Sequence, residues 1–186
     1  MIPIIVVIAA VGVLLVGALW LMSTYNGLVT LRQAVKNAWA QIDVQLKRRH
    51  DLIPNLVNTV KGYAGHEKDT LERVIAARAK ATSVTLPADV IKAEGELSSA
   101  LARLLAVSES YPELKANQNF LSLQEELTST ENRVAYARQF YNDNVTRLNT
   151  RIQTFPTVAV AGMFGFKEEP FFEAPAEAKE APKVQF

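Results

Sequence analysis

The chain contains no cysteine and only two histidines, His50 and His66. The lack of cysteine excludes disulfide bonds, thiolate zinc sites and a cysteine nucleophile. A zinc centre would have to draw its remaining ligands from scattered carboxylates. Twenty basic and nineteen acidic side chains give a formal charge of +1, which is too little to attract nucleic acid over the whole surface. We therefore expect no metal, no cofactor and no nucleic-acid partner.

Catalytic motifs are also lacking. His66-Glu67 begins like the H-E-x-x-H of metalloproteases, but Thr70 stands at the position of the second histidine. The chain has no G-x-S-x-G, and the glycines at 162 and 165 lack the spacing and the hydroxyl residue of a phosphate-binding loop. The sequence therefore predicts that the protein is not an enzyme.

Charge is missing from the first 31 residues, where Ile4 to Met22 form one apolar run. A bilayer core of about 30 Å needs about 20 helical residues, so this run is long enough to cross it. A cleaved signal peptide is the alternative, but no basic residue precedes the run and no small-x-small cleavage site follows it. We expect residues 1–24 to be a retained transmembrane anchor.

Basic residues near the anchor predict its orientation. Arg32 and Lys36 follow it before the first acid, Asp43, whereas no basic side chain precedes it. The positive-inside rule then places the N-terminus outside and the rest of the chain in the cytoplasm, at the bacterial inner membrane.

Prolines are scarce between the anchor and Gln153, and apolar residues there recur at helical spacing. The sequence predicts an all-α fold, in which a transmembrane helix precedes an elongated up-and-down antiparallel bundle over residues 25–155. Helices are expected over 88–107 and 113–155. The apolar stripe of the last one is Phe120, Leu123, Leu127, Val134, Tyr141, Val145, Leu148, Ile152 and Phe155.

Pro54 decides the number of helices. Its missing N–H leaves the carbonyl of His50 without an intrahelical donor, which favours a reversal of the chain near residue 50 and a bundle of four helices. A kink at Pro54 is the alternative, because the apolar stripe stays almost in phase across it, and this gives three helices.

An aromatic segment follows the bundle, over residues 156–173. It contains Phe164, Phe166, Phe171 and Phe172, which either dock on the bundle as a strap or contact a partner or the membrane. Residues 174–186 are rich in proline, alanine and glutamate and predict a disordered tail.

Polar residues at two places are candidates for a site. Arg49 falls on an apolar stripe and needs a carboxylate partner, for which Glu125, Glu126 and Glu131 of the last helix are candidates. That helix also carries Gln124, Asn132 and Arg138. These groups form either an internal polar network with a solvated face or a surface for a protein partner.

Several gap-free segments resemble the LemA family of bacterial proteins. They run from the anchor to the aromatic segment and include Tyr25-Asn26-Gly27-Leu28-Val29, Asp51-Leu52-Ile53-Pro54-Asn55-Leu56-Val57, Val60-Lys61-Gly62-Tyr63 and Thr130-Glu131-Asn132-Arg133. The resemblance implies a single-pass membrane protein with a four-helix cytoplasmic bundle. It implies no catalytic residue and no molecular activity.

Three functions follow as hypotheses. The first is a membrane-anchored, non-enzymatic scaffold or adaptor that contacts a protein partner or further copies of itself. The second is an enzyme or ligand-binding protein with a polar pocket inside the bundle. The third is a lipid-surface protein that uses the aromatic segment.

Overall fold

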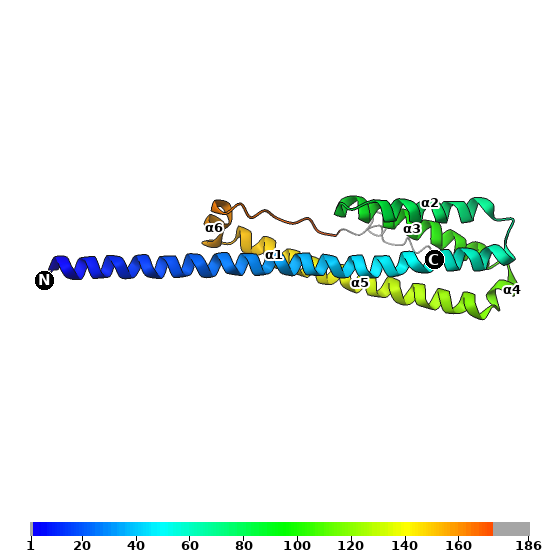
Figure 1. Cartoon of the computed structure of the whole chain (residues 1–186), viewed down its shortest axis with the longest axis horizontal. Helices are drawn as coiled ribbons and strands as arrows, with labels where there is room; N and C mark the ends of the chain where they lie inside the picture. Colours follow the sequence, from blue (N-terminus) through cyan, green and yellow to red (C-terminus); the bar gives the residue numbers. More distant parts are fainter. Residues whose placement is uncertain (1, 173–186) are drawn as a thin grey trace, which may run out of the picture. The chain divides into compact units, whose positions relative to one another are not determined.

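The computed structural model describes residues 2–172, and every regular element within them is a helix. Figure 1 shows the helices along the chain. They are α1 (Ile2–Tyr63), α2 (Lys68–Ser83), α3 (Pro87–Ser108), α4 (Pro112–Lys115), α5 (Gln118–Gln153) and α6 (Thr157–Met163). The predicted all-α class is confirmed. Residue 173 of the aromatic segment and the predicted tail, 174–186, lie outside the described residues.

The chain packs as two compact units, and α1 and α5 contribute to both. The anchor unit contains residues up to Ala40 together with Gln139–Phe171. The bundle unit contains Gln41–Arg138 and, among the described residues, Phe172.

The first part of α1 is the apolar run of the anchor unit. Its most apolar window has a mean hydropathy of 3.0, and none of that window is buried. The side chains between Ile4 and Leu19 are exposed on all sides of the helix. The helix is thus long and apolar enough to cross a membrane, as predicted from the sequence.

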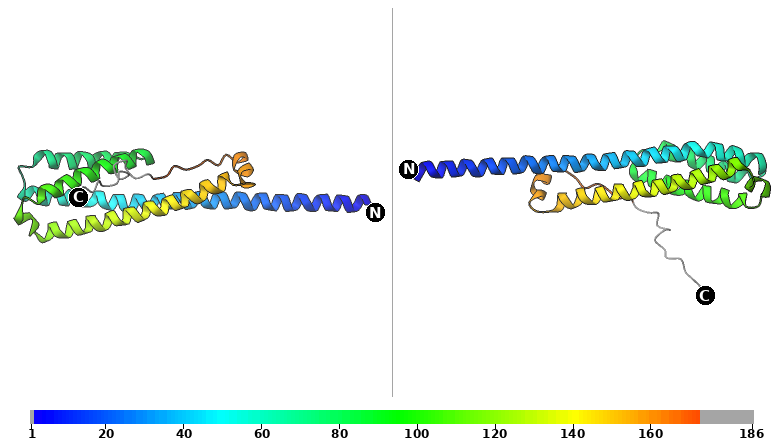
Figure 2. Two further views of the ribbon diagram at one scale, coloured as in Figure 1. Left: turned by 180° about the vertical axis from the view of Figure 1, so that it is seen from behind. Right: turned by 90° about the horizontal axis from the view of Figure 1, so that it is seen from below.

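The bundle unit holds four long helical segments whose consecutive members run in opposite directions (Figures 1 and 2). They are the end of α1, then α2, α3 and the first part of α5. The short helix α4 lies between α3 and α5 in the chain. This is the up-and-down topology that the sequence predicted.

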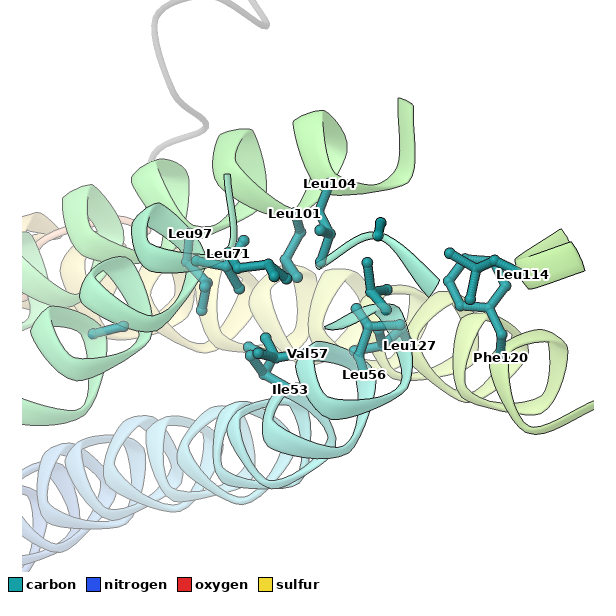
Figure 3. Packing of buried hydrophobic residues seen from close by; sticks show 14 of the residues in the cluster. Ile53, Leu56, Val57, Leu71, Leu97, Leu101, Leu104, Leu114, Phe120 and Leu127 are labelled. Atoms are coloured by element: carbon teal, nitrogen blue, oxygen red, sulfur yellow. The ribbon is translucent and has the colours of Figure 1, made fainter. Parts of the chain in front are cut away.

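Leucine, isoleucine, valine and phenylalanine side chains from all of these helices fill the core of the bundle unit (Figure 3). Each contributes about 1.5–3 kcal/mol when its surface leaves water. The core includes Ile53, Leu56, Val57, Leu71, Leu97, Leu101, Leu104, Leu114, Phe120 and Leu127.

The predicted reversal near Pro54 is wrong. The helix α1 continues through Pro54 to Tyr63, and the chain reverses at 64–67 instead. The alternative of three helices is also wrong, because this turn separates α2 from α1. Two glycines, Gly62 and Gly65, mark the turn in the sequence. The bundle has four helical segments, but the first of them is continuous with the anchor.

A side chain from α2 explains why Pro54 is tolerated inside α1. Proline at 54 cannot donate to the carbonyl of His50. Arg78 on α2 donates its Nε–H to that carbonyl oxygen at 2.7 Å. The backbone group that Pro54 leaves unpaired is therefore satisfied by a neighbouring helix, so the chain does not have to break there.

This contact predicts energetic coupling between Arg78 and Pro54. Arg78→Met is expected to destabilise the protein by about 1–3 kcal/mol, since the partly buried carbonyl of His50 loses a charged donor. In a Pro54→Ala background the loss should be smaller, because the N–H of alanine can donate to His50 within the helix. Urea unfolding of the four variants in detergent, followed by circular dichroism, measures the coupling. An equal loss in both backgrounds would contradict this account.

Candidate functional site

A buried ion cluster joins α1 and α3 inside the bundle unit. Arg49 is 4% exposed and Glu94 is 1% exposed. The guanidinium of Arg49 donates to Oε2 of Glu94 at 3.1 Å and to Oγ of Ser98 at 2.9 Å. Both charges are therefore removed from water and depend on each other for compensation.

His50 gives Glu94 a second partner. Its Nε2 lies 2.6 Å from Oε1 of Glu94, and the histidine is also buried. Each oxygen of the carboxylate thus contacts a different side chain of α1. Since the His50 carbonyl accepts from Arg78, this short part of α1 is tied to both α2 and α3.

Arg138 of α5 adds a second guanidinium near the cluster. Burial, and then repulsion from Arg49, lower the pKa of Arg138, while Glu94 and Glu131 oppose the shift. Its guanidinium carbon lies 4.5 Å from the ring centre of Phe172, and its Nε is buried without a hydrogen-bond partner. Arg49 and Arg138 therefore both interact electrostatically with the carboxylate of Glu94, so positive charge is in excess in the cluster.

The predicted partners of Arg49 on the last helix are wrong. Glu125, Glu126 and Glu131 are exposed, and the carboxylate that pairs with Arg49 is Glu94 on α3. The sequence contains a signal for it. Glu94 follows Val90 by four residues and precedes Leu97 by three, so it occupies a core position of the α3 stripe.

The polar candidates on α5 do not form one site. Arg138 joins the buried cluster, whereas Glu131 is exposed and acts on Arg138 through its charge alone. Gln124 and Asn132 instead line an open hollow on the surface. All six residues that line the hollow belong to α5, at steps of three and one: Leu121, Gln124, Glu125, Thr128, Ser129 and Asn132.

The aromatic segment divides into docked and exposed rings. Phe166 and Phe172 are buried, as expected of a strap, whereas Phe164 and Phe171 are each 48% exposed. In the anchor unit Phe166 packs edge-on against Tyr25, and the guanidinium carbon of Arg32 lies 5.0 Å from its ring centre. Gly165 has a φ of 68°, which lets the backbone turn between Phe164 and Phe166.

Hydrogen bonds hold the backbone of the segment against α5 in the anchor unit. Asn149 donates to the carbonyl of Glu169 and accepts from its N–H, both at 2.9 Å. The hydroxyl of Tyr141 donates to the carbonyl of Pro170 at 2.9 Å. Phe155, which the sequence placed on the apolar stripe of the last helix, is instead 84% exposed.

Metal ligands do not gather anywhere in the part of the chain that the structure describes. Over residues 2–172 no three histidine or acidic side chains are placed to hold a metal ion. The cluster of Arg49, His50 and Glu94 carries two basic groups and one acid, which is unsuited to a cation.

Comparisons with known proteins agree with the motifs. The LemA family model matches residues 38–186. Protein LemA of Metamycoplasma hominis is 25% identical over 150 residues, which are 80% of this chain and 68% of that protein. Magnetosome protein MamQ 2 of Paramagnetospirillum magneticum is 26% identical over 179 residues, covering 82% of this chain and 66% of that protein. Magnetosome protein MamQ of Magnetospirillum gryphiswaldense is 24% identical over 183 residues, with 84% and 67% covered.

The chain thus spans about two thirds of the length of these relatives. The family match begins inside α1 and includes the buried cluster, the α5 hollow and the aromatic segment. Because it covers well over half of the residues, this chain belongs to the LemA family.

Proposed function

We propose that this chain is a membrane-anchored, non-enzymatic scaffold of the bacterial inner membrane. Its N-terminus lies outside and its bundle unit lies in the cytoplasm, as Arg32 and Lys36 beside the anchor favour. It acts by protein–protein contact, and the contact face is the open hollow of α5.

The hollow is the observation that carries this proposal. Its lining residues recur at the spacing by which helices pack, yet all of them come from α5. One of them, Leu121, is a large apolar side chain that is 44% exposed. In the proposed contact, a helix from another molecule packs on this face.

The chemistry of the face favours a second copy of this chain. The hydroxyls of Thr128 and Ser129 and the amides of Gln124 and Asn132 each donate and accept hydrogen bonds. These four groups are complementary to themselves, as a two-fold contact between identical surfaces requires, and the contact must keep the two Glu125 carboxylates of the hollow apart.

The buried ion cluster supports a structural role for the charges inside the bundle. Arg49 and Glu94 spend their hydrogen bonds on each other and on Ser98. Arg49, one of the polar groups that the ligand-binding alternative would use, is therefore already paired. The scaffold also accounts for the exposed polar face of α5, where Gln124 and Asn132 lie.

Cysteine cross-linking in membranes tests the proposal, because the chain has no cysteine of its own. Ser129→Cys in the full-length chain is expected to give a covalent dimer with a bis-maleimide reagent. The matched control is Glu72→Cys at an exposed position of α2, which should remain monomeric.

The Ser129→Cys variant should also resist a membrane-impermeant maleimide in intact cells and react after permeabilisation, because the bundle is cytoplasmic.

Two outcomes contradict the proposal. A Ser129→Cys variant that stays monomeric, or that dimerises no more than Glu72→Cys, would exclude the contact through this face. Labelling of Ser129→Cys by the impermeant reagent in intact cells would reverse the orientation.

A further inference from the structure

The outer face of α6 is apolar and exposed. Val158 is 45% exposed and Met163 is 72% exposed, and Phe155 just before the helix is 84% exposed. The opposite face of α6, formed by Thr157, Val160 and Ala161, is buried in the anchor unit. A helix that is apolar on both faces lies in a core or in contact with lipid.

No charged residue occurs over 152–166, whereas basic residues stand at both ends of this stretch. Arg151 precedes it, and Lys167 follows it together with Glu168 and Glu169. An uncharged apolar segment can enter the boundary between headgroups and acyl chains without burying a charge.

The position of α6 in the anchor unit indicates which surface covers it. The ring centre of Tyr25 lies 4.8 Å from the ring centre of Phe164 and 5.8 Å from the ring centre of Phe166. Tyr25 follows the last residue of the apolar run, Met22, by three positions. At 1.5 Å per residue this is about 4.5 Å along α1.

That distance falls within the headgroup layer. The layer extends about 5–8 Å beyond the hydrocarbon on each side of a bilayer. The residues of α1 become buried at Thr24, two positions after the apolar run ends. Figures 1 and 2 both show α6 beside this part of α1. Within the anchor unit, α6 therefore lies beside the residues of α1 that directly follow the apolar run.

We infer that the outer face of α6 is a second lipid-contacting surface, which inserts into the headgroup layer of the bilayer that α1 spans. The inference rests on the membrane anchoring in the proposed function and is independent of the α5 contact. Its contact residues are Phe155, Val158 and Met163. Phe166, which is buried against Tyr25, holds the segment in place and does not touch lipid.

Fluorescence of a single labelled cysteine tests this surface. The full-length Met163→Cys variant, carrying an environment-sensitive dye, is reconstituted into phosphatidylcholine vesicles with phosphatidylglycerol as the minor lipid. We expect a blue-shifted emission, protection from iodide in the aqueous phase, and loss of most of the fluorescence to a spin label on the upper acyl chain. Val158→Cys should behave in the same way.

Ile75→Cys is the matched control, because Ile75 is an exposed apolar residue of α2. It should be quenched by iodide and unaffected by the lipid spin label. Iodide quenching of Met163→Cys equal to that of Ile75→Cys would overturn the inference. Protection from iodide without quenching by the lipid spin label would also overturn it, since a protein then covers α6. Neither result depends on cross-linking at Ser129, so the two proposals fail separately.

Discussion

Glu94→Ala is expected to destabilise the bundle unit by about 3–5 kcal/mol. Glu94 is the only buried carboxylate over residues 2–172, and it offsets the positive charges of Arg49 and Arg138. Arg49 and His50 would both lose their partner, and Arg49 would keep only its hydrogen bond to Ser98. The repulsion between Arg49 and Arg138 would then be uncompensated within the cluster. Urea unfolding of the full-length protein in detergent measures the loss.

Glu96→Ala is the matched control on the same helix. Glu96 forms an ion pair with Lys80 at 2.6 Å, but both side chains are about half exposed. Exposed pairs are screened by water and contribute little, so we expect stability close to that of the unaltered protein. If the two variants were equally stable, the buried cluster would not hold the bundle together.

A double variant separates charge from packing. Arg49→Met with Glu94→Leu removes both charges and keeps side-chain volume, and such replacements are often neutral in buried ion pairs. We expect the double variant to be more stable than Glu94→Ala. A double variant that is less stable would mean that the pairing of these two side chains is not the dominant contribution of Glu94.

Phe166→Ala is expected to release the aromatic segment from the anchor unit at a cost of about 3 kcal/mol. Phe166 is 9% exposed and contacts both Tyr25 and Arg32, so its removal leaves a cavity and takes one ring contact from each of these side chains. The local opening should accelerate amide hydrogen exchange over residues 164–171 by about 100-fold.

The control is Phe164→Ala, at a ring that is 48% exposed and also contacts Tyr25. Removing it loses less buried surface, so the exchange should change much less. Equal acceleration in the two variants would show that the segment is not held by Phe166. Exchange measured by mass spectrometry resolves this segment from the rest of the chain.

The helices of this protein can be predicted from its sequence because their apolar residues recur at steps of three and four. The extent of α3 follows from Pro87 and its apolar stripe. The single helix expected over 113–155 is wrong, because α4 ends at Lys115 and α5 begins at Gln118. The anchor follows from length and the absence of charge alone.

The path of the chain between α1 and α2 could not be predicted in the same way. Local rules place a break near Pro54, but the donor that satisfies the His50 carbonyl comes from Arg78, which is distant in the sequence.

Glu94 was missed for a related reason, since acidic residues are usually exposed and its burial depends on Arg49 and His50. In the aromatic segment, composition alone could not separate buried Phe166 and Phe172 from half-exposed Phe164 and Phe171.

The contact from Arg78 to the His50 carbonyl has a consequence for folding. Until α2 has docked, the His50 carbonyl of α1 can bond only to water, because Pro54 supplies no N–H. Residues 50–63 of α1 and the whole of α2 therefore form one cooperative hairpin, in which neither helix reaches its full stability alone. The order of folding in this region is therefore set by a tertiary contact. The turn of α1 that follows Pro54 becomes ordered together with α2.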